Sequence, residues 1–296
     1  MIKNEQELQA RIASCVANLD KKFTGADGKR AIVICGGTGC LSSDSQAIID
    51  EFNKLIAEKG LEEKVTVNKV GCFGFCSQGP FVKIFPEDTL YRTVSVADVA
   101  EIVEKDLINN EIVERLLYVD PISGQKVQKQ DEINFYKKQL RLALHGCGTI
   151  NPENIDEALG DGAFQGITKA LKMTQQEVVD EVLASGLRGR GGGGFPTGRK
   201  WQFALNQQSE EKYVVCNADE GDPGAFMDRS VLEGDPHCII EAMAICGYAT
   251  GATEGYVYVR AEYPIAVNRL QIAIDQAREY GLLGKNIFNS GFDFNL

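Results

Sequence analysis

The sequence contains no apolar run approaching the roughly 18 residues that a membrane-spanning helix needs. It also lacks an excess of basic residues, because 31 Lys and Arg stand against 42 Asp and Glu, for a formal net charge of −11. Nucleic-acid binding depends on cations that neutralise phosphates, so this charge balance argues against it. The polar N-terminus Met1–Glu7 has no apolar segment behind it, which predicts no export signal. We therefore expect a cytoplasmic protein without a membrane span.

Cysteine, in contrast, is abundant. Nine cysteines occur in 296 residues. Cytosolic thiols are kept reduced, so metal ligation or redox chemistry is a better expectation for them than disulfides. Hydrophobic residues make up 44% and charged residues 25%, the usual range for a globular protein, and the length suffices for two domains.

The first hundred residues alternate between helical and strand patterns, which predicts a compact α/β domain. Helices are expected at 4–20, from Ser45 to about Gly60 and at 96–107, and strands at 31–34, 65–67, 81–85 and 91–94. Residues 109–145 have no clear period and predict a turn-rich connector.

The second half predicts another α/β domain. Thr174 and Glu177 form a capping-box pattern that opens a helix through Leu183, and a glycine-rich loop follows. Further elements are expected at 213–216 (strand), 236–247 (helix), 256–260 (strand) and from 264 onward (helix). Residues 291–296 alternate like the start of a strand, so we expect this domain to be incomplete at Leu296.

Four cysteines form two pairs in glycine-rich loops. Four residues separate Cys35 from Cys40, and three separate Cys72 from Cys76. Each pair follows a predicted strand, and parallel neighbouring strands would bring the two loops together. Four thiolates can hold zinc or an iron–sulfur cluster, while a group of buried thiols without metal is the structural alternative. Zinc sites favour shorter spacings and often include His, which neither loop contains.

Residues 1–108 resemble the thioredoxin-like [2Fe–2S] ferredoxin domain of the complex I 24 kDa subunit. The resemblance lies in the segments Cys35-Gly36-Gly37-Thr38-Gly39-Cys40 and Gly71-Cys72-Phe73-Gly74-Phe75-Cys76. It implies one [2Fe–2S] cluster, with one iron on Cys35 and Cys40 and the other on Cys72 and Cys76.

The loop over residues 185–201 is the most unusual stretch of the sequence. It contains the pattern Gly189-x-Gly191-x-x-Gly194, but a predicted helix precedes it, so we exclude an ordinary Rossmann motif. Exposed backbone N–H groups, cations and aromatic rings suit an anionic, planar ligand, and a flexible surface loop is the alternative. The cations are Arg190, Arg199 and Lys200, and the rings belong to Phe195, Trp201 and Phe203.

An acidic motif, Cys216–Phe226, follows directly after a predicted strand. Its asparagine and carboxylates could bind a ring edge and ribose hydroxyls. A capped acidic turn is the alternative.

From about residue 140 onward, the chain resembles the FMN- and NADH-binding 51 kDa-type subunit of complex I, through residues 186–192 and 217–220. Gly193 departs from the alanine of many relatives. The resemblance implies FMN contacts from Gly189, Arg190, Gly191, Gly192, Lys200, Asn217, Asp219 and Glu220, and nicotinamide and adenine contacts from Phe195, Phe203 and Asp222. We thus predict a [2Fe–2S] domain over 1–108, a connector over 109–145 and an FMN/NADH domain over 146–296.

This fusion resembles the NADH-oxidising subunit of multimeric [FeFe]-hydrogenases, including electron-bifurcating ones. The resemblance implies a hetero-oligomer with a hydrogenase catalytic subunit and a small [2Fe–2S] subunit, and a [4Fe–4S] site beyond residue 296. A diaphorase subunit of formate dehydrogenase and a non-catalytic electron-wiring subunit are the alternatives. Hydride transfer to flavin needs no side chain as acid or base. We expect the 296 residues alone not to form a competent NADH dehydrogenase.

The remaining cysteines and one histidine predict structural roles. Cys147 is expected to be a packed turn thiol, Cys216 to end a buried strand, and Cys238 and Cys246 to lie in the core. His237 is expected to be exposed or to cap a helix.

Overall fold

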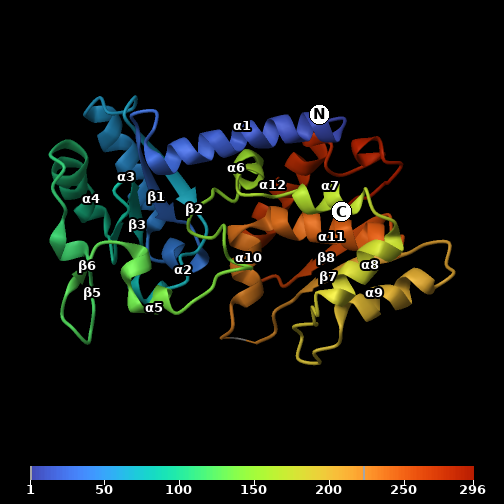
Figure 1. Cartoon of the computed structure of the whole chain (residues 1–296). Helices are drawn as coiled ribbons and strands as arrows, with labels where there is room; N and C mark the ends of the chain where they lie inside the picture. Colours follow the sequence, from blue (N-terminus) through green and yellow to red (C-terminus); the bar gives the residue numbers. More distant parts are fainter. Residues whose placement is uncertain (1, 223) are drawn as a thin grey trace. The chain divides into compact units, whose positions relative to one another are not determined.

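A computed structural model describes residues 2–222 and 224–296, so Pro223 of the acidic motif lies outside the described residues. The chain divides into two compact units (Figure 1). The first comprises residues 15–161 with 233–235, and the second contains the segment before Cys15 with 162–232 and 236–296. Both units combine helices and strands, which confirms the α/β class.

A four-stranded sheet in the order β2–β1–β3–β4 forms the centre of the first unit. Its strands are β1 (Arg30–Cys35), β2 (Val65–Val70), β3 (Val82–Phe85) and β4 (Thr89–Tyr91). β1 pairs with β2 in parallel, with Cys35 opposite Val70, and with β3 in antiparallel orientation. All but the first residue of β1 are buried, as its continuous apolar run predicts for a central strand. The last strand was expected at 91–94 but ends at Tyr91.

Helices and two core clusters complete this unit. The helices are α1 (Glu5–Thr24), which continues across the unit boundary, α2 (Thr38–Leu41), α3 (Ser45–Glu58), α4 (Val96–Ile102) with a π-helical continuation (Val103–Ile108), and α6 (Ile155–Gly160). One core cluster joins sheet residues to α3 and α4. The other contains Cys35 and Cys40 together with several aromatic residues, so two of the four predicted cluster ligands lie within a packed core.

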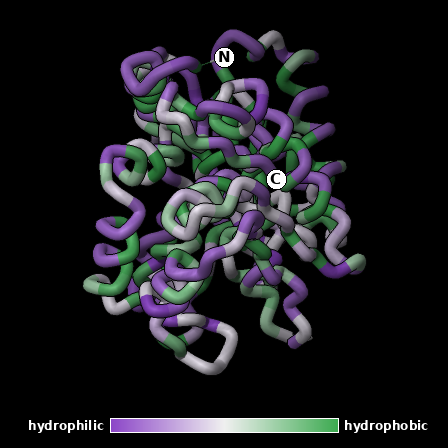
Figure 2. The backbone as a smooth tube through the Cα atoms, turned by 90° about the vertical axis from the view of Figure 1, so that its right-hand side faces the viewer, coloured by the Kyte–Doolittle hydropathy of each residue, from purple (hydrophilic) through white to green (hydrophobic). Residues whose placement is uncertain are grey.

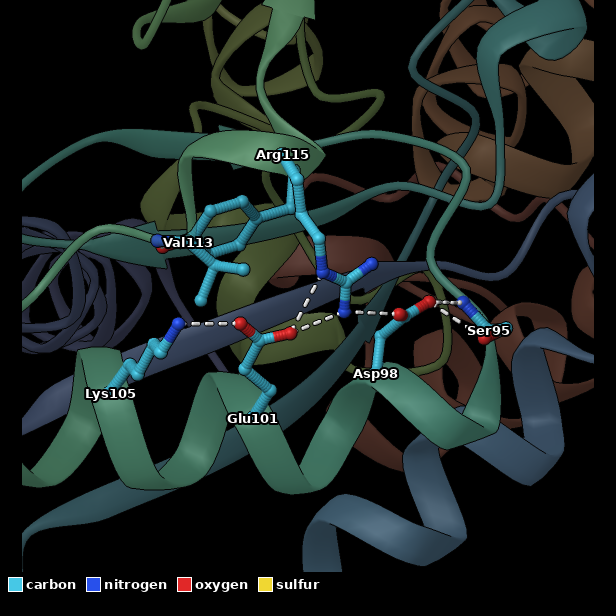
Figure 3. Close-up of polar contacts among 7 residues, drawn as sticks. Ser95, Asp98, Glu101, Lys105, Val113 and Arg115 are labelled. Atoms are coloured by element: carbon cyan, nitrogen blue, oxygen red, sulfur yellow. Dashed lines mark hydrogen bonds and ion pairs between the residues drawn. The ribbon is translucent and has the colours of Figure 1, made fainter.

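Residues 109–145 pack against the first unit. They form the hairpin β5 (Tyr118–Val119) and β6 (Lys126–Val127), the helix α5 (Asn134–Lys137) and the 3-10 turns η3 (Glu114–Leu116) and η4 (Gln130–Glu132). Figure 3 shows Arg115 reaching α4, where its Nη2 lies 2.6 Å from Asp98 Oδ1 and its Nε donates to Glu101 Oε2 at 2.8 Å. Val113 is buried in the core beside α4. The connector is thus a structural part of this unit, and the boundaries at 108 and 145 stay predictions.

The second unit contains a parallel pair of strands and several helices. The strands are β7 (Tyr213–Ala218) and β8 (Glu254–Val259), and the helices are α7 (Gln165–Ala170), α8 (Gln175–Ala184), α9 (Thr197–Asn206), α10 (Met227–Gly234), α11 (Pro236–Thr250) and α12 (Pro264–Tyr280), with the 3-10 turn η5 (Ile287–Asn289). The capping box is confirmed, because Thr174 and Glu177 bond each other's backbone N–H groups at 2.7 and 3.2 Å.

β7 and β8 form a two-stranded sheet. Val215 is 65% exposed and Cys216 is half-buried, so the prediction that Cys216 ends a buried strand is wrong. Alternate β7 side chains are exposed because one face of this sheet is open to solvent. The predicted C-terminal strand occurs as a parallel bridge, with the Gly255 N–H donating to the Asn295 carbonyl at 2.8 Å.

Within residues 2–222 and 224–296, no helix is both long and apolar enough to cross a membrane. Figure 2 shows hydrophobic and hydrophilic stretches alternating along the chain.

His237 lies near the start of α11 and is completely buried, so the prediction of an exposed or capping residue is wrong. Its Nε2 lies 3.3 Å from Gln276 Oε1, and its Nδ1 has no hydrogen-bond partner among the described residues. Burial lowers the pKa of His237 to about 4, although the bond to Gln276 opposes the shift. The imidazole is therefore neutral at physiological pH.

We expect the second unit to lose stability as the pH falls from 6.5 towards 4. In that range the unfolded chain protonates His237 while the folded unit does not, so protonation favours unfolding. Between pH 6.5 and 5.0 this amounts to about 2 kcal/mol. Urea unfolding followed by the fluorescence of Trp201, which lies on α9 of the same unit, measures it. A His237→Gln variant should lose most of this dependence, whereas His145→Gln, in the other unit, should retain it.

Candidate cofactor sites

The parallel pairing of β1 and β2 brings the two cysteine loops together. Cys35 ends β1 and Cys40 lies on α2, while Cys72 follows β2 and Cys76 begins the 3-10 turn η1 (Cys76–Gln78). Both loops leave the same end of the sheet because the strands run in parallel. The Sγ atoms of Cys72 and Cys76 are 3.7 Å apart. Cys35 and Cys40 are buried, whereas Cys76 is exposed.

Glycines create the space for these thiols. A Cβ at Gly37 would lie 3.1 Å from Cys72 Cβ, and a Cβ at Gly79 would lie 2.7 Å from Cys40 Sγ. Any larger residue at Gly79 would therefore displace the Cys40 thiol. Gly79 was missed by the sequence analysis because it follows the Cys72–Cys76 pair and only the fold places it beside Cys40. The close approach of both loops suits a compact cluster held between them.

The cysteine thiols alter each other's acidity. A hydrogen bond with the Cys40 thiol is the main cause that raises the pKa of Cys35 to about 12. A hydrogen bond with Cys35 likewise raises the pKa of Cys72. Bound iron would relieve this unfavourable crowding of thiolates and release their protons. Among the described residues, no three His, Cys, Asp or Glu side chains converge as they would on a single metal ion.

In the second unit, the glycine-rich loop is closed at its base by backbone hydrogen bonds. The Gly189 N–H donates to the Phe195 carbonyl at 2.8 Å, and the Thr197 N–H donates to the Leu187 carbonyl at 2.9 Å. The loop lies between α8 and α9, so a helix does precede it. Apart from its two chain neighbours, no atom of residues 2–222 and 224–296 lies within 4 Å of a Cβ built on Gly191. The backbone there is open to a ligand.

The glycine loop and the acidic motif line one pocket. Its volume is about 290 Å³, and its lining includes Arg190 and Gly191 from the loop and Asn217, Asp219 and Glu220 from the end of β7. The sequence analysis missed three other lining residues: Gly221, Met227 and Asp228. The start of α10 just after the acidic motif is the signal that could have found the last two.

Glu220 also has a structural role. The residue is 8% exposed, and its carboxylate accepts hydrogen bonds from the Met227 N–H and, at 3.2 Å, from the Arg229 N–H. It therefore holds the first turn of α10. Burial, reinforced by the charge of Glu220, raises the pKa of Asp228 on the same turn. The pocket lining thus combines carboxylate acceptors for ligand hydroxyl groups with the cationic residue Arg190.

Six predicted site residues do not line this pocket: Gly189, Gly192, Phe195, Lys200, Phe203 and Asp222. Phe195 and Phe203 form an exposed aromatic pair with ring centroids 6.3 Å apart. Asp222 Oδ1 accepts a hydrogen bond from the Gly224 N–H at 3.2 Å, as in a capped turn. Of the other predicted structural cysteines, Cys147 is buried, and Cys238 and Cys246 are half-buried.

Comparison with known proteins identifies both units. Residues 11–106 match the thioredoxin-like [2Fe–2S] ferredoxin family, and residues 182–291 match the Nuo51 FMN-binding domain family. The chain therefore combines a thioredoxin-like [2Fe–2S] ferredoxin domain with an FMN-binding domain of the complex I 51 kDa type, which confirms the predicted fold and cofactor classes.

Curated relatives match about half of this chain. The chain is 64% identical over 160 residues to the NADP-reducing hydrogenase subunit HndC of Solidesulfovibrio fructosivorans, covering 54% of this chain and 32% of that protein. It is 52% identical over 157 residues to a subunit of the NADH-quinone oxidoreductase of Aquifex aeolicus (strain VF5), covering 53% and 37%. The chain thus spans about a third of the length of these relatives.

A solved structure is similar to the first half. The thioredoxin-like [2Fe–2S] ferredoxin from Aquifex aeolicus is 30% identical, with a TM-score of 0.28, and the match covers 30% of this chain and 94% of that one.

Proposed function

We propose that the protein exchanges electrons between NAD(H), FMN and iron–sulfur clusters as the diaphorase subunit of a larger complex. The observation that carries the proposal is the shared pocket, where two motifs that lie apart in the sequence converge on about 290 Å³. A cavity of this size accommodates part of a flavin nucleotide. Its guanidinium, backbone N–H groups and acidic acceptors are the groups that a phosphate and a polyhydroxyl chain require.

Within this proposal, the pocket residues bind and orient the cofactor. Arg190 and the backbone at Gly191 receive the phosphate or ring oxygens, and Asn217 and Asp219 bind the ring edge and hydroxyls. FMN, when bound, accepts electrons in pairs from NADH and releases them singly to iron–sulfur clusters. Contacts from Gly189, Gly192 and Lys200 to FMN, and from Phe195, Phe203 and Asp222 to the nicotinamide and adenine, belong to the same proposal. Exposed rings such as Phe195 and Phe203 can stack on a planar ligand.

The four cysteines Cys35, Cys40, Cys72 and Cys76 are proposed as the ligands of the [2Fe–2S] cluster. Their two loops meet at one end of the sheet, and glycines leave space beside their thiols. We extend the proposal to a cytoplasmic hetero-oligomer with a hydrogenase catalytic subunit and a small [2Fe–2S] subunit.

Flavin binding and reduction test the proposal. The native complex, isolated through this protein, should contain stoichiometric FMN, and NADH should bleach its flavin absorbance. An electron-wiring subunit with a vestigial flavin site would bind no FMN, and that result would contradict the proposal. Replacing Arg190 with Gln should weaken FMN binding by about ten- to a hundredfold, since a charge-assisted hydrogen bond contributes about 1.5–3 kcal/mol.

A further inference from the structure

We propose that helix α5 and the nearby Arg141 are part of the cluster site, where they cover the Cys72–Cys76 loop and set the reduction potential. The inference rests on the proposed ligation of the cluster by the four cysteines. It assigns a redox role to a segment whose sequence predicts only a connector. Three independent contacts carry it, all within the first unit.

The first contact comes from Tyr136 on α5. Its side chain is 6% exposed, and its hydroxyl donates to the Phe73 carbonyl at 3.1 Å. Phe73 directly follows Cys72, so this bond holds the loop backbone next to a ligand. Tyr136 also belongs to the core cluster that contains Cys35 and Cys40. A connector residue thus packs in the same core as the buried thiols.

The second contact comes from Phe135. Its ring stacks on that of Phe75 with centroids 4.3 Å apart and planes 19° apart. Phe75 directly precedes Cys76, and Phe135 is 39% exposed. The Phe135 ring therefore forms an outer layer over the part of the loop that carries the exposed thiol.

The third contact places a positive charge beside the loop. Arg141 Nη2 lies 3.4 Å from the Cys72 carbonyl oxygen. Arg141 is half-buried, so solvent screens its charge less than that of a fully exposed side chain.

These contacts act on the potential in opposite directions. Reduction adds a negative charge to a cluster that already has four thiolate ligands. Excluding water disfavours that charge and lowers the potential, whereas a nearby cation favours it and raises the potential. Loss of Phe135 should therefore raise the midpoint potential, and loss of Arg141 should lower it. A purely structural role would not produce opposite shifts.

The test is an anaerobic redox titration of the full chain, with the reduced cluster followed by electron paramagnetic resonance. At a fixed potential, Arg141→Gln should raise the oxidised-to-reduced ratio roughly threefold, and Phe135→Ala should lower it by a similar factor. Threefold corresponds to about 30 mV for a one-electron couple. Lys138→Gln is the matched control, because it removes an exposed charge from the same segment. Shifts of the same sign in both variants, or an equal shift in the control, would overturn the proposal.

Thiol labelling supplies a readout without a cofactor. In the cluster-free chain, Phe135→Ala should speed the alkylation of Cys72, the half-buried thiol of the loop, severalfold, as measured by peptide mass spectrometry, and Lys138→Gln should not. An unchanged labelling rate in Phe135→Ala would overturn the covering role of Phe135, even if the cysteines bind the cluster. If labelling accelerates but reconstitution yields no cluster, the proposed ligation by the four cysteines is contradicted. The proposed covering by Phe135 is then still supported.

Discussion

Replacing Cys40 with alanine should reduce bound iron and acid-labile sulfide from about two atoms each per chain to background. Cys40 is 3% exposed and lies in the same core as Cys35, so a cluster in this position would have no water ligand at hand to replace the thiolate. Alanine is preferable to serine because a serine oxygen can itself bind iron. Iron and sulfide analysis of anaerobically reconstituted protein, together with the visible absorbance of the cluster, provides the measurement.

Cys238→Ala is the control for general damage, because Cys238 is a half-buried cysteine on α11. This variant should retain full iron and sulfide. Two results would contradict the assignment: wild-type protein that contains zinc without sulfide, or a Cys40→Ala variant that keeps both irons. The first would restore the zinc alternative, and the second would mean that another group completes the ligand set.

Replacing Gly191 with valine should weaken FMN binding by at least about a hundredfold, close to 2.7 kcal/mol. Gly191 lines the pocket, and among the described residues no atom beyond its two chain neighbours lies within 4 Å of a Cβ built there. The valine side chain can therefore be accommodated by the fold, but it would occupy space that the ligand needs. Fluorescence titration with FMN measures the loss, and the [2Fe–2S] content should remain unchanged because the cysteines lie in the other unit.

Gly193→Val is the matched control. It adds the same side chain to the same loop, but Gly193 does not line the pocket. Its new Cβ also has no described atom within 4 Å other than those of its two chain neighbours. It should reduce FMN affinity far less. Stoichiometric FMN in purified Gly191→Val protein would show that the glycine-rich loop does not bind FMN. Gly192 is less informative because its φ of +95° would strain any β-branched residue.

The sequence determined the features that depend on short stretches of chain. The α/β alternation, the capping box at Thr174 and the two cysteine pairs all follow from residues within a few positions of each other. The two pairs could be predicted to meet because a predicted strand precedes each, and parallel pairing of β1 and β2 makes their loops neighbours. Glycine-rich segments likewise indicated where backbone would be open to ligands.

Only the tertiary structure decided what depends on contacts between distant segments. His237 is buried because α11 is packed on several sides within its unit. The position of His237 near the start of a predicted helix does not reveal this packing. Glu220 bonds the start of α10, and Asp228 joins the pocket, because the chain turns back after β7. Residues 109–145 lack hydrophobic periodicity because each of their short elements packs separately. Tyr136 from this segment nevertheless lies in the core that contains Cys35 and Cys40. The roles of these side chains depend on neighbours that are distant in the sequence. The local sequence pattern therefore does not indicate them.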